Sequence, residues 1–262
     1  MDRQAQQVLD IAREAGHAIL EVYQNDFAVQ HKGDDSPLTA ADLASHRVIT
    51  QRLGELDADV PVLSEEGADI PFEQRRQWAR YWLIDPLDGT REFVKRNGEF
   101  TVNIALIEEG RPVLGVVHVP VTGISYVGRV GDGAWKLDSD GNAEQIRVSA
   151  RRQPTARVAG SRSHAGDSLK RFLDRLGDHE IVSMGSSLKL CLVAEGTADI
   201  YPRLGPTSEW DTAAAQAVVE AAGGRVTDTA LQPLRYNTKA SLLNPHFLVF
   251  GDCGENWERY LR

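Results

Sequence analysis

The stretch that decides the fold spans residues 81–90 and reads Tyr-Trp-Leu-Ile-Asp-Pro-Leu-Asp-Gly-Thr. Its first four residues are aromatic or aliphatic, and such a short apolar run predicts a buried strand. Pro86 lacks a backbone N–H and is expected to end the strand, while Gly89 permits a tight turn. A short helix is expected over residues 90–95. The stretch therefore holds its two aspartates between the end of a strand and the start of a helix.

Two carboxylates in such a position favour chemistry on a phosphate ester. Divalent cations such as Mg²⁺ prefer oxygen ligands, and the N–H groups that begin a helix attract phosphate. A simpler interpretation is a turn, because Asp-Pro and Asp-Gly pairs are common in turns and an aspartate often caps a helix. The stretch also resembles the Asp-x-Asp-Gly-Thr motif of haloacid dehalogenase phosphatases, in which the first aspartate is phosphorylated. Here two residues separate Asp85 from Asp88, which on an extended strand changes the face that the second carboxylate occupies.

The composition limits the class of protein. The chain has 262 residues, of which 42% are hydrophobic, enough for one large core or two closely packed lobes. No window approaches the roughly 18 apolar residues that cross a bilayer, and the first residues lack the pattern of a signal peptide. Cys191 and Cys253 form neither a disulfide framework nor a zinc motif. These features predict a cytoplasmic protein without an integral membrane segment.

The net charge of −9 argues against a nucleic-acid polymer as a partner, because duplex binding needs a basic face. It is compatible with a small anionic ligand. Part of the acidic excess could be a carboxylate cluster that a metal neutralises, and the rest would be solvated surface.

Residues 1–150 carry signals for both helices and strands, which agree with the N-terminal α+β lobe that the family resemblance described below implies. Helices are expected over residues 2–24 and from about residue 36 to residue 56, and Thr39 and Asp42 form a capping box at the start of the second. The strands after residue 100 are expected to form an antiparallel meander. The expected strands, besides the one that ends at Pro86, cover residues 61–64, 101–107, 113–119, 124–127 and 133–136.

A change in composition near residues 149–156 marks the expected boundary with a C-terminal α/β lobe over residues 151–262. Beyond it, strands alternate with helices, which is typical of α/β proteins. Gly223-Gly224 gives a stop signal for the last of these helices. Strands are expected over residues 156–160 and 197–201, and helices over residues 169–176, 187–195 and 212–222.

Four acidic positions recur at a strand end or a helix start: Asp42, Glu65, the Asp85/Asp88 pair, and Asp211. Taken singly, each could be a helix cap or a solvated carboxylate. Taken together they favour a single site, because helix caps that arise independently need not occur with a turn such as residues 85–90, whose two aspartates could bind a metal.

The chain resembles the inositol monophosphatase superfamily of Mg²⁺-dependent, Li⁺-sensitive phosphatases. Three motifs carry the resemblance in family order: Glu65-Glu66, residues 85–90, and Trp210-Asp211-Thr212-Ala213-Ala214. Within the superfamily the chain looks most like the bacterial CysQ group, the 3′(2′),5′-bisphosphate nucleotidases. Residues 95–106, 161–164, 185–189, 192–196 and 201–203 suggest this group. The resemblance covers roughly residues 9–250 and implies a layered αβαβα sandwich of the inositol monophosphatase/fructose bisphosphatase type, with the site between two lobes.

The resemblance implies a site with two or three Mg²⁺ ions. Glu65, Asp85 and the backbone carbonyl of Leu87 would hold the first ion. Asp85, Asp88 and Asp211 would hold the second, and Glu65 would reach a third through water. The same ligands, Asp85 excepted, are expected to contact the substrate.

The resemblance also implies how the water and the phosphate are held. Thr90 and Asp42 would orient and deprotonate the attacking water, with Glu65 as a third catalytic residue. The N–H groups of Gly89 and Thr90 would hold the phosphate oxygens.

Four further residues would contact a nucleotide by resemblance: Ser161, His164, Gly185 and Lys189. Lys189 would meet a second phosphate as a point charge, which a simple inositol monophosphatase does not need. The alternatives are a loop histidine with local hydrogen bonds at residue 164 and a solvated lysine on an amphipathic helix at residue 189.

The expected reaction is hydrolysis of the 3′-phosphate of adenosine 3′,5′-bisphosphate to AMP without a phosphoenzyme. The sulfated analogue 3′-phosphoadenosine 5′-phosphosulfate (PAPS) would be a second substrate. Alternatives are an inositol or other sugar phosphatase with the same metal site, a phospho-aspartate mechanism, and a non-catalytic module that binds metal or nucleotide. The oligomeric state stays open, and any contact with the inner membrane is expected to be peripheral.

Overall fold

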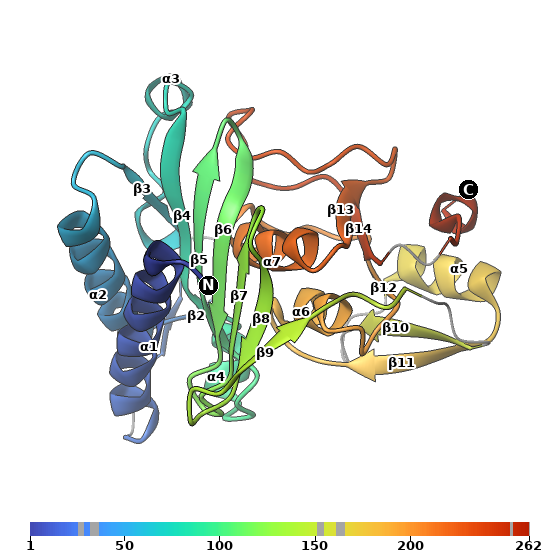
Figure 1. The fold of residues 1–262 in the computed structure, drawn as a ribbon, viewed down its shortest axis with the longest axis horizontal. Helices are drawn as coiled ribbons and strands as arrows, with labels where there is room; N and C mark the ends of the chain where they lie inside the picture. The colour runs from blue at the N-terminus through green and yellow to red at the C-terminus, as the bar shows by residue number, and fades with distance from the viewer. Residues whose placement is uncertain (26–28, 32–36, 151–154, 161–165, 252–253, 262) are drawn as a thin grey trace.

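The structure, a computed structural model, describes residues 1–25, 29–31, 37–150, 155–160, 166–251 and 254–261. Helical layers alternate with two β-sheets, as Figure 1 shows. The first layer consists of α1 (Arg3–Tyr23) and α2 (Ala40–Leu56), which are joined through a small hairpin of β1 (Val29–His31) and β2 (Pro37–Thr39). The Thr39–Asp42 capping box expected at the start of α2 is present.

The second layer is a seven-stranded sheet with the strand order β3-β4-β5-β6-β7-β8-β9. Only the β3–β4 pair is parallel, and the remainder is the expected antiparallel meander, extended by β9. Two short helices, η1 (Glu65–Gly67) and α3 (Phe72–Arg75), separate the first two strands. The strands are β3 (Val62–Ser64), β4 (Arg80–Asp88), β5 (Thr101–Glu108), β6 (Arg111–His118), β7 (Ser125–Arg129), β8 (Gly133–Leu137) and β9 (Ala143–Ile146).

The expectation that β4 ends at Pro86 is wrong. Asp85 pairs with Asn103 and Asp88 pairs with Thr101, so two residues of β4 oppose one of β5. Pro86 lies in this bulge, where its missing N–H removes no ladder hydrogen bond. In a regular strand, residues three apart point to opposite faces. The extra residue therefore brings the Asp88 carboxylate to the same side as that of Asp85. Helix α4 (Thr90–Val94) follows after Gly89, whose φ of 94° matches the expected turn.

The fourth layer is a five-stranded sheet with the order β11-β10-β12-β14-β13. β10 is parallel to β11 and β12, whereas β14 is antiparallel to β12 and β13. The strand expected over residues 197–201 begins at Ile200, because the chain first turns at Gly196, whose φ is 74°. The strands are β10 (Ala156–Gly160), β11 (His179–Ser183), β12 (Ile200–Arg203), β13 (Arg225–Asp228) and β14 (Phe247–Phe250).

The third layer lies between the two sheets and contains α6 (Leu188–Ala194) and α7 (Trp210–Ala221) (Figure 1). All residues of α6 are buried, so the amphipathic interpretation of this segment is wrong. One hydrophobic cluster joins both sheets through these helices and includes Leu83, Val193, Val218 and Val249. The fifth layer, α5 (Asp167–Leu176) with η2 (Trp257–Tyr260), packs on the far face of the second sheet. These five layers are the expected αβαβα sandwich, while the division into lobes at residue 150 stays a prediction.

Two glycines fix the position of α7 on the first sheet. A Cβ atom at Gly115 would lie 2.0 Å from the carbonyl oxygen of Ala214, and one at Gly128 would lie 2.3 Å from Cα of Val218. The helix backbone therefore rests directly on β6 and β7. This close packing brings the first turn of α7, and with it Asp211, to the bulged end of β4. Among the described residues, no helix has both the length and the hydropathy that a membrane span requires.

Candidate active site

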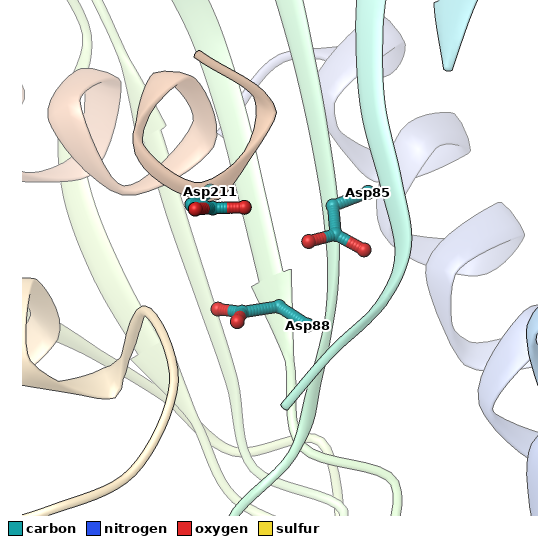
Figure 2. Close-up of side chains that lie close together, drawn as sticks. All are labelled: Asp85, Asp88 and Asp211. Carbon is teal, nitrogen blue, oxygen red and sulfur yellow. The ribbon is translucent and has the colours of Figure 1, made fainter. Parts of the chain in front are cut away.

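Three aspartates converge where β4 ends and α7 begins (Figure 2). Asp85 and Asp88 come from the two sides of the β4 bulge, and Asp211 comes from the first turn of α7. Each offers a carboxylate oxygen, and these oxygens all lie within 4.8 Å of one another. Asp211 therefore lies beside Asp85 and Asp88, as the resemblance implied, although more than 120 residues separate it from them in the chain.

Backbone N–H groups orient each carboxylate. The N–H of Leu87 donates to Asp85 Oδ1 at 3.0 Å, and that of Ser187 donates to Asp88 Oδ2 at 2.6 Å. The carboxylate of Asp211 accepts the N–H of Ser208 at 2.9 Å. Each carboxylate thus keeps further lone pairs for a shared ligand.

Glu65 completes the acidic cluster from the start of η1, directly after β3. Burial is the main cause that raises the pKa of Asp85 well above its usual value, and the charges of Glu65, Asp88 and Asp211 raise it further. Burial and the charge of Asp88 likewise raise the pKa of Asp211 well above its usual value. Carboxylates this close repel one another when ionised. A divalent cation would remove this repulsion, and a donor set made only of oxygen atoms suits Mg²⁺.

Asp42 has two roles that the sequence analysis treated as alternatives. Its Oδ2 accepts hydrogen bonds from the Thr39 N–H at 2.8 Å and the Thr39 hydroxyl at 2.7 Å, which caps α2. Its Oδ1 lies 3.3 Å from the Thr90 hydroxyl, which is also 3.4 Å from the carbonyl oxygen of Leu87. The buried cap therefore holds a carboxylate oxygen against Thr90, next to the acidic cluster.

A cleft of about 630 Å³ opens from the aspartates toward the second sheet. Asp88, Gly89 and Asp211 line it, and so do Gly185 and Lys189, whose expected contact with a nucleotide stays a prediction. Arg91 also lines the cleft. Ser161 and His164, which were expected to contact a nucleotide, lie outside the described residues.

Lys189 is 8% exposed, so the interpretation as a solvated helix lysine is wrong. Its Nζ donates to the carbonyl oxygens of Ser186 at 2.6 Å and Met184 at 3.4 Å, and it lies 5.7 Å from the centre of the Tyr201 ring. Burial lowers the pKa of Lys189, and the negative charge of Asp88 opposes that effect. An ammonium group has three N–H donors, and the hydrogen bonds of Lys189 to described residues use two of them.

Sequence reasoning missed the part that Ser186 and Ser187 play. The hydroxyl of Ser186 donates to the backbone oxygens of Asp88 at 2.9 Å and Glu99 at 2.7 Å, and the N–H of Ser187 holds the Asp88 carboxylate. Both serines lie in the run 185–189 that had been singled out only for Gly185 and Lys189. Their closeness to Asp88 follows from the packing of α6 and could not be read from local sequence.

Arg203 is a second residue that sequence reasoning did not assign. It lines the cleft, and its guanidinium group is fixed by the hydroxyl of Thr207 at 2.6 Å and the carbonyl oxygen of Pro206 at 2.8 Å. The only signal in the sequence is the position of Arg203 in the run Tyr201-Pro202-Arg203. With Lys189 and Arg91 it gives the cleft three cationic side chains.

Comparison with known families and curated sequences gives consistent matches. The model of the inositol monophosphatase family matches residues 2–252. The 3′(2′),5′-bisphosphate nucleotidase CysQ of Salmonella typhimurium is 54% identical over 93% of this chain and 98% of its own length. The protein of the same name from Haemophilus influenzae is 39% identical over 96% of this chain and 94% of its own length.

Solved structures resemble the chain over nearly its whole length. CysQ from Bacteroides thetaiotaomicron has a TM-score of 0.83 at 41% identity, covering 95% of this chain and 97% of its own. An IMPase from Thermotoga maritima has a TM-score of 0.81 at 26% identity, covering 100% of this chain and 97% of its own. The two TM-scores are nearly equal, so the fold does not distinguish the substrates, whereas the sequence identities differ clearly.

Proposed function

Because this chain belongs to the inositol monophosphatase family, we propose that it is a 3′(2′),5′-bisphosphate nucleotidase that hydrolyses the 3′-phosphate of adenosine 3′,5′-bisphosphate to AMP and phosphate. PAPS is the second substrate and gives the 5′-phosphosulfate. The observation that carries the proposal is the 54% identity to a nucleotidase over 93% of the chain. The 26% identity to the IMPase from Thermotoga maritima gives inositol phosphate much weaker support.

The acidic cluster fits Mg²⁺, because its donors are all oxygen atoms and its buried carboxylates repel one another. Glu65, Asp85 and the carbonyl oxygen of Leu87 would hold one ion, and Asp85, Asp88 and Asp211 another; Glu65 would reach a third through water. Bound Mg²⁺ would lower the pKa of the attacking water and stabilise charge on the phosphate and the leaving oxygen.

Asp42 and Thr90 prepare the attacking water. The Thr90 hydroxyl is 3.3 Å from Asp42 Oδ1, so Thr90 can donate its proton to Asp42 and accept one from water. The water proton then passes toward Asp42 as the water oxygen attacks phosphorus, and the bond to the 3′-oxygen breaks, so that this oxygen leaves as an alkoxide and takes up a proton from solvent. The N–H groups of Gly89 and Thr90 hold the phosphate oxygens.

A phospho-aspartate mechanism has less support than attack by water. Asp85 is the residue that would be phosphorylated, and its carboxylate is 1% exposed. It lies against the charges of Glu65, Asp88 and Asp211, which would repel an anionic phosphate unless cations intervened. A non-catalytic binding module would not need the Asp42–Thr90 pair.

The three cationic side chains of the cleft, Arg91, Lys189 and Arg203, support the nucleotide as the substrate, because they offer a second anion contacts apart from the aspartates. Lys189 would contact the second phosphate with its remaining donor, while Gly185, Ser161 and His164 would contact the nucleoside. At Gly185 a Cβ atom would lie 2.8 Å from the carbonyl oxygen of Glu99, so a larger residue would displace this wall of the cleft. The proposed ligand is thus a small nucleotide. We propose further that the enzyme works in the cytoplasm and that any contact with the inner membrane is peripheral.

Lys189→Met tests the nucleotide assignment. Adenosine 3′,5′-bisphosphate is compared with adenosine 3′-monophosphate, which has the same reacting group but lacks the second phosphate. Removal of one charge-assisted hydrogen bond should raise KM for the bisphosphate by about 10- to 100-fold and leave KM for the monophosphate nearly unchanged. Lys170→Met, at an exposed position of α5, is the matched control. An equal loss for both substrates would contradict the assigned contact, and it would indicate that Lys189 only supports Asp88.

A further inference from the structure

A second cavity, of about 340 Å³, lies beside the C-terminal half of α7. Arg111 at the start of β6, Arg225 at the start of β13 and Arg235 in the loop after β13 line it together with Gln216 and Glu220 of α7. None of the residues that line this cavity lines the active-site cleft. The cavity is therefore a separate place in the fold, which we call the α7 cavity.

The α7 cavity carries a surplus of positive charge. Its lining has three arginines and a single carboxylate, Glu220, which leaves a surplus of two positive charges in a protein whose net charge is −9. Among the described residues, no carboxylate forms an ion pair with Arg111, Arg225 or Arg235. Glu108, which lies opposite Arg111 where β5 turns into β6, is bound to Arg80 at 3.3 Å.

The carboxylate of Glu220 is held as part of the cavity wall. Gln216 Nε2 donates to Glu220 Oε1 at 2.8 Å, and the hydroxyl of Tyr236 donates to Gln216 Oε1 at 2.6 Å. Gln216 is 1% exposed, so this part of the wall cannot rearrange cheaply. Arg111 and Arg235 lie close enough to oppose the rise that burial causes in the pKa of Glu220. The part of the wall that Gln216 and Glu220 form is therefore organised before any ligand arrives, whereas the three arginines are exposed and would order on binding.

The geometry points to a second ligand site: we propose that the α7 cavity binds a small molecule that carries a sulfate or phosphate group. Guanidinium groups pair with such oxyanions through two parallel hydrogen bonds and stay charged at all physiological pH values. A surplus of two positive charges matches a dianionic group. The volume of about 340 Å³ lies near the lower end of the range of about 300–1,000 Å³ for small-molecule sites and leaves room for more than the bare oxyanion.

Inorganic sulfate is the probe that tests this site. Backbone amide signals are followed by NMR as sulfate replaces chloride at constant ionic strength, with EDTA present so that no metal recruits sulfate to the acidic cluster. Saturable shifts are expected for residues 216–235. Arg225→Ala combined with Arg235→Ala should weaken this binding by at least about tenfold, the loss of one charge-assisted hydrogen bond.

Arg3→Ala combined with Arg47→Ala is the control, because it removes the same charge from exposed positions of α1 and α2. It should bind sulfate as the unmodified protein does, and both double variants should keep their phosphatase activity, which shows that they fold. Equal weakening by both variants would mean a general charge effect and would overturn the proposal. Shifts confined to the active-site cleft, or the absence of saturation, would also overturn it.

Discussion

The repulsion within the acidic cluster should make Asp211→Asn more stable than the unmodified protein when metal is removed. The aspartate oxygens lie within 4.8 Å of one another, and at an effective dielectric constant of about 20 each ionised pair would cost roughly 3 kcal/mol. Proton uptake relieves part of this cost, because the pKa values of Asp85 and Asp211 are raised. The free energy of unfolding of Asp211→Asn is therefore expected to be about 2 kcal/mol higher than that of the unmodified protein. The amide oxygen of the new asparagine can still accept the hydrogen bond from the Ser208 N–H.

For a chain of this length, about 2 kcal/mol corresponds to a rise in Tm of roughly 4–8 °C in EDTA. Thermal unfolding with EDTA and with Mg²⁺ measures the effect. Mg²⁺ should raise the Tm of the unmodified protein, because a ligand that binds only the folded state stabilises it. The Tm of the variant should rise little. Turnover should fall at least about 100-fold, since even residues that only support metal ligands are worth 10- to 100-fold.

Asp174→Asn, at an exposed position of α5, is the control for this prediction and should change neither Tm nor turnover. A lower Tm for Asp211→Asn in EDTA would refute the reasoning from repulsion. An undiminished response of the variant to Mg²⁺ would refute the assignment of Asp211 as a ligand.

Three further predictions concern single residues. Gly89→Ala should cost about 1–3 kcal/mol in urea unfolding, because φ at Gly89 is +94° and the new Cβ would lie 2.1 Å from the hydroxyl of Ser186; an unchanged midpoint would contradict the turn geometry. Thr90→Val should lower kcat by about 10²-fold with little change in KM, and a change in KM alone would argue against proton transfer to Asp42. Burial lowers the pKa of His118 to about 4 from 6.5, so the folded protein binds fewer protons and loses stability as the pH falls from 6.5 toward 4. Relative to His118→Gln this loss should approach about 3 kcal/mol, and parallel pH profiles would show that the histidine charges freely.

The layered fold was predicted from the resemblance to a family, and local signals in the sequence agree with many of its elements. The apolar spacing in α1 and the capping box of α2 can be read directly. The bulge in β4 cannot, because a proline after an apolar run equally indicates the end of a strand. The packing of α7 on Gly115 and Gly128 also cannot be read from the sequence, because nothing near either glycine indicates which helix will cover it.

In the candidate site, too, some features could be predicted from the sequence and others arise only from the tertiary fold. Asp85, Asp88 and Asp211 were predicted to meet because their motifs resemble those of a family, not because spacing alone brings them together. The burial of Lys189 depends on the position of α6 between two sheets, and local periodicity misread that helix as amphipathic. The α7 cavity left no signal, because its arginines come from separate segments that only the tertiary fold unites.

Phosphate release shows most directly whether this metal-dependent phosphatase acts on a nucleotide bisphosphate. Adenosine 3′,5′-bisphosphate and inositol 1-phosphate are compared in Mg²⁺, with and without Li⁺. We expect fast release from the nucleotide that EDTA abolishes and Li⁺ slows, and little release from inositol 1-phosphate. Faster release from inositol 1-phosphate would contradict the substrate assignment while leaving the metal site intact, and release from neither would contradict the assignment as a phosphatase.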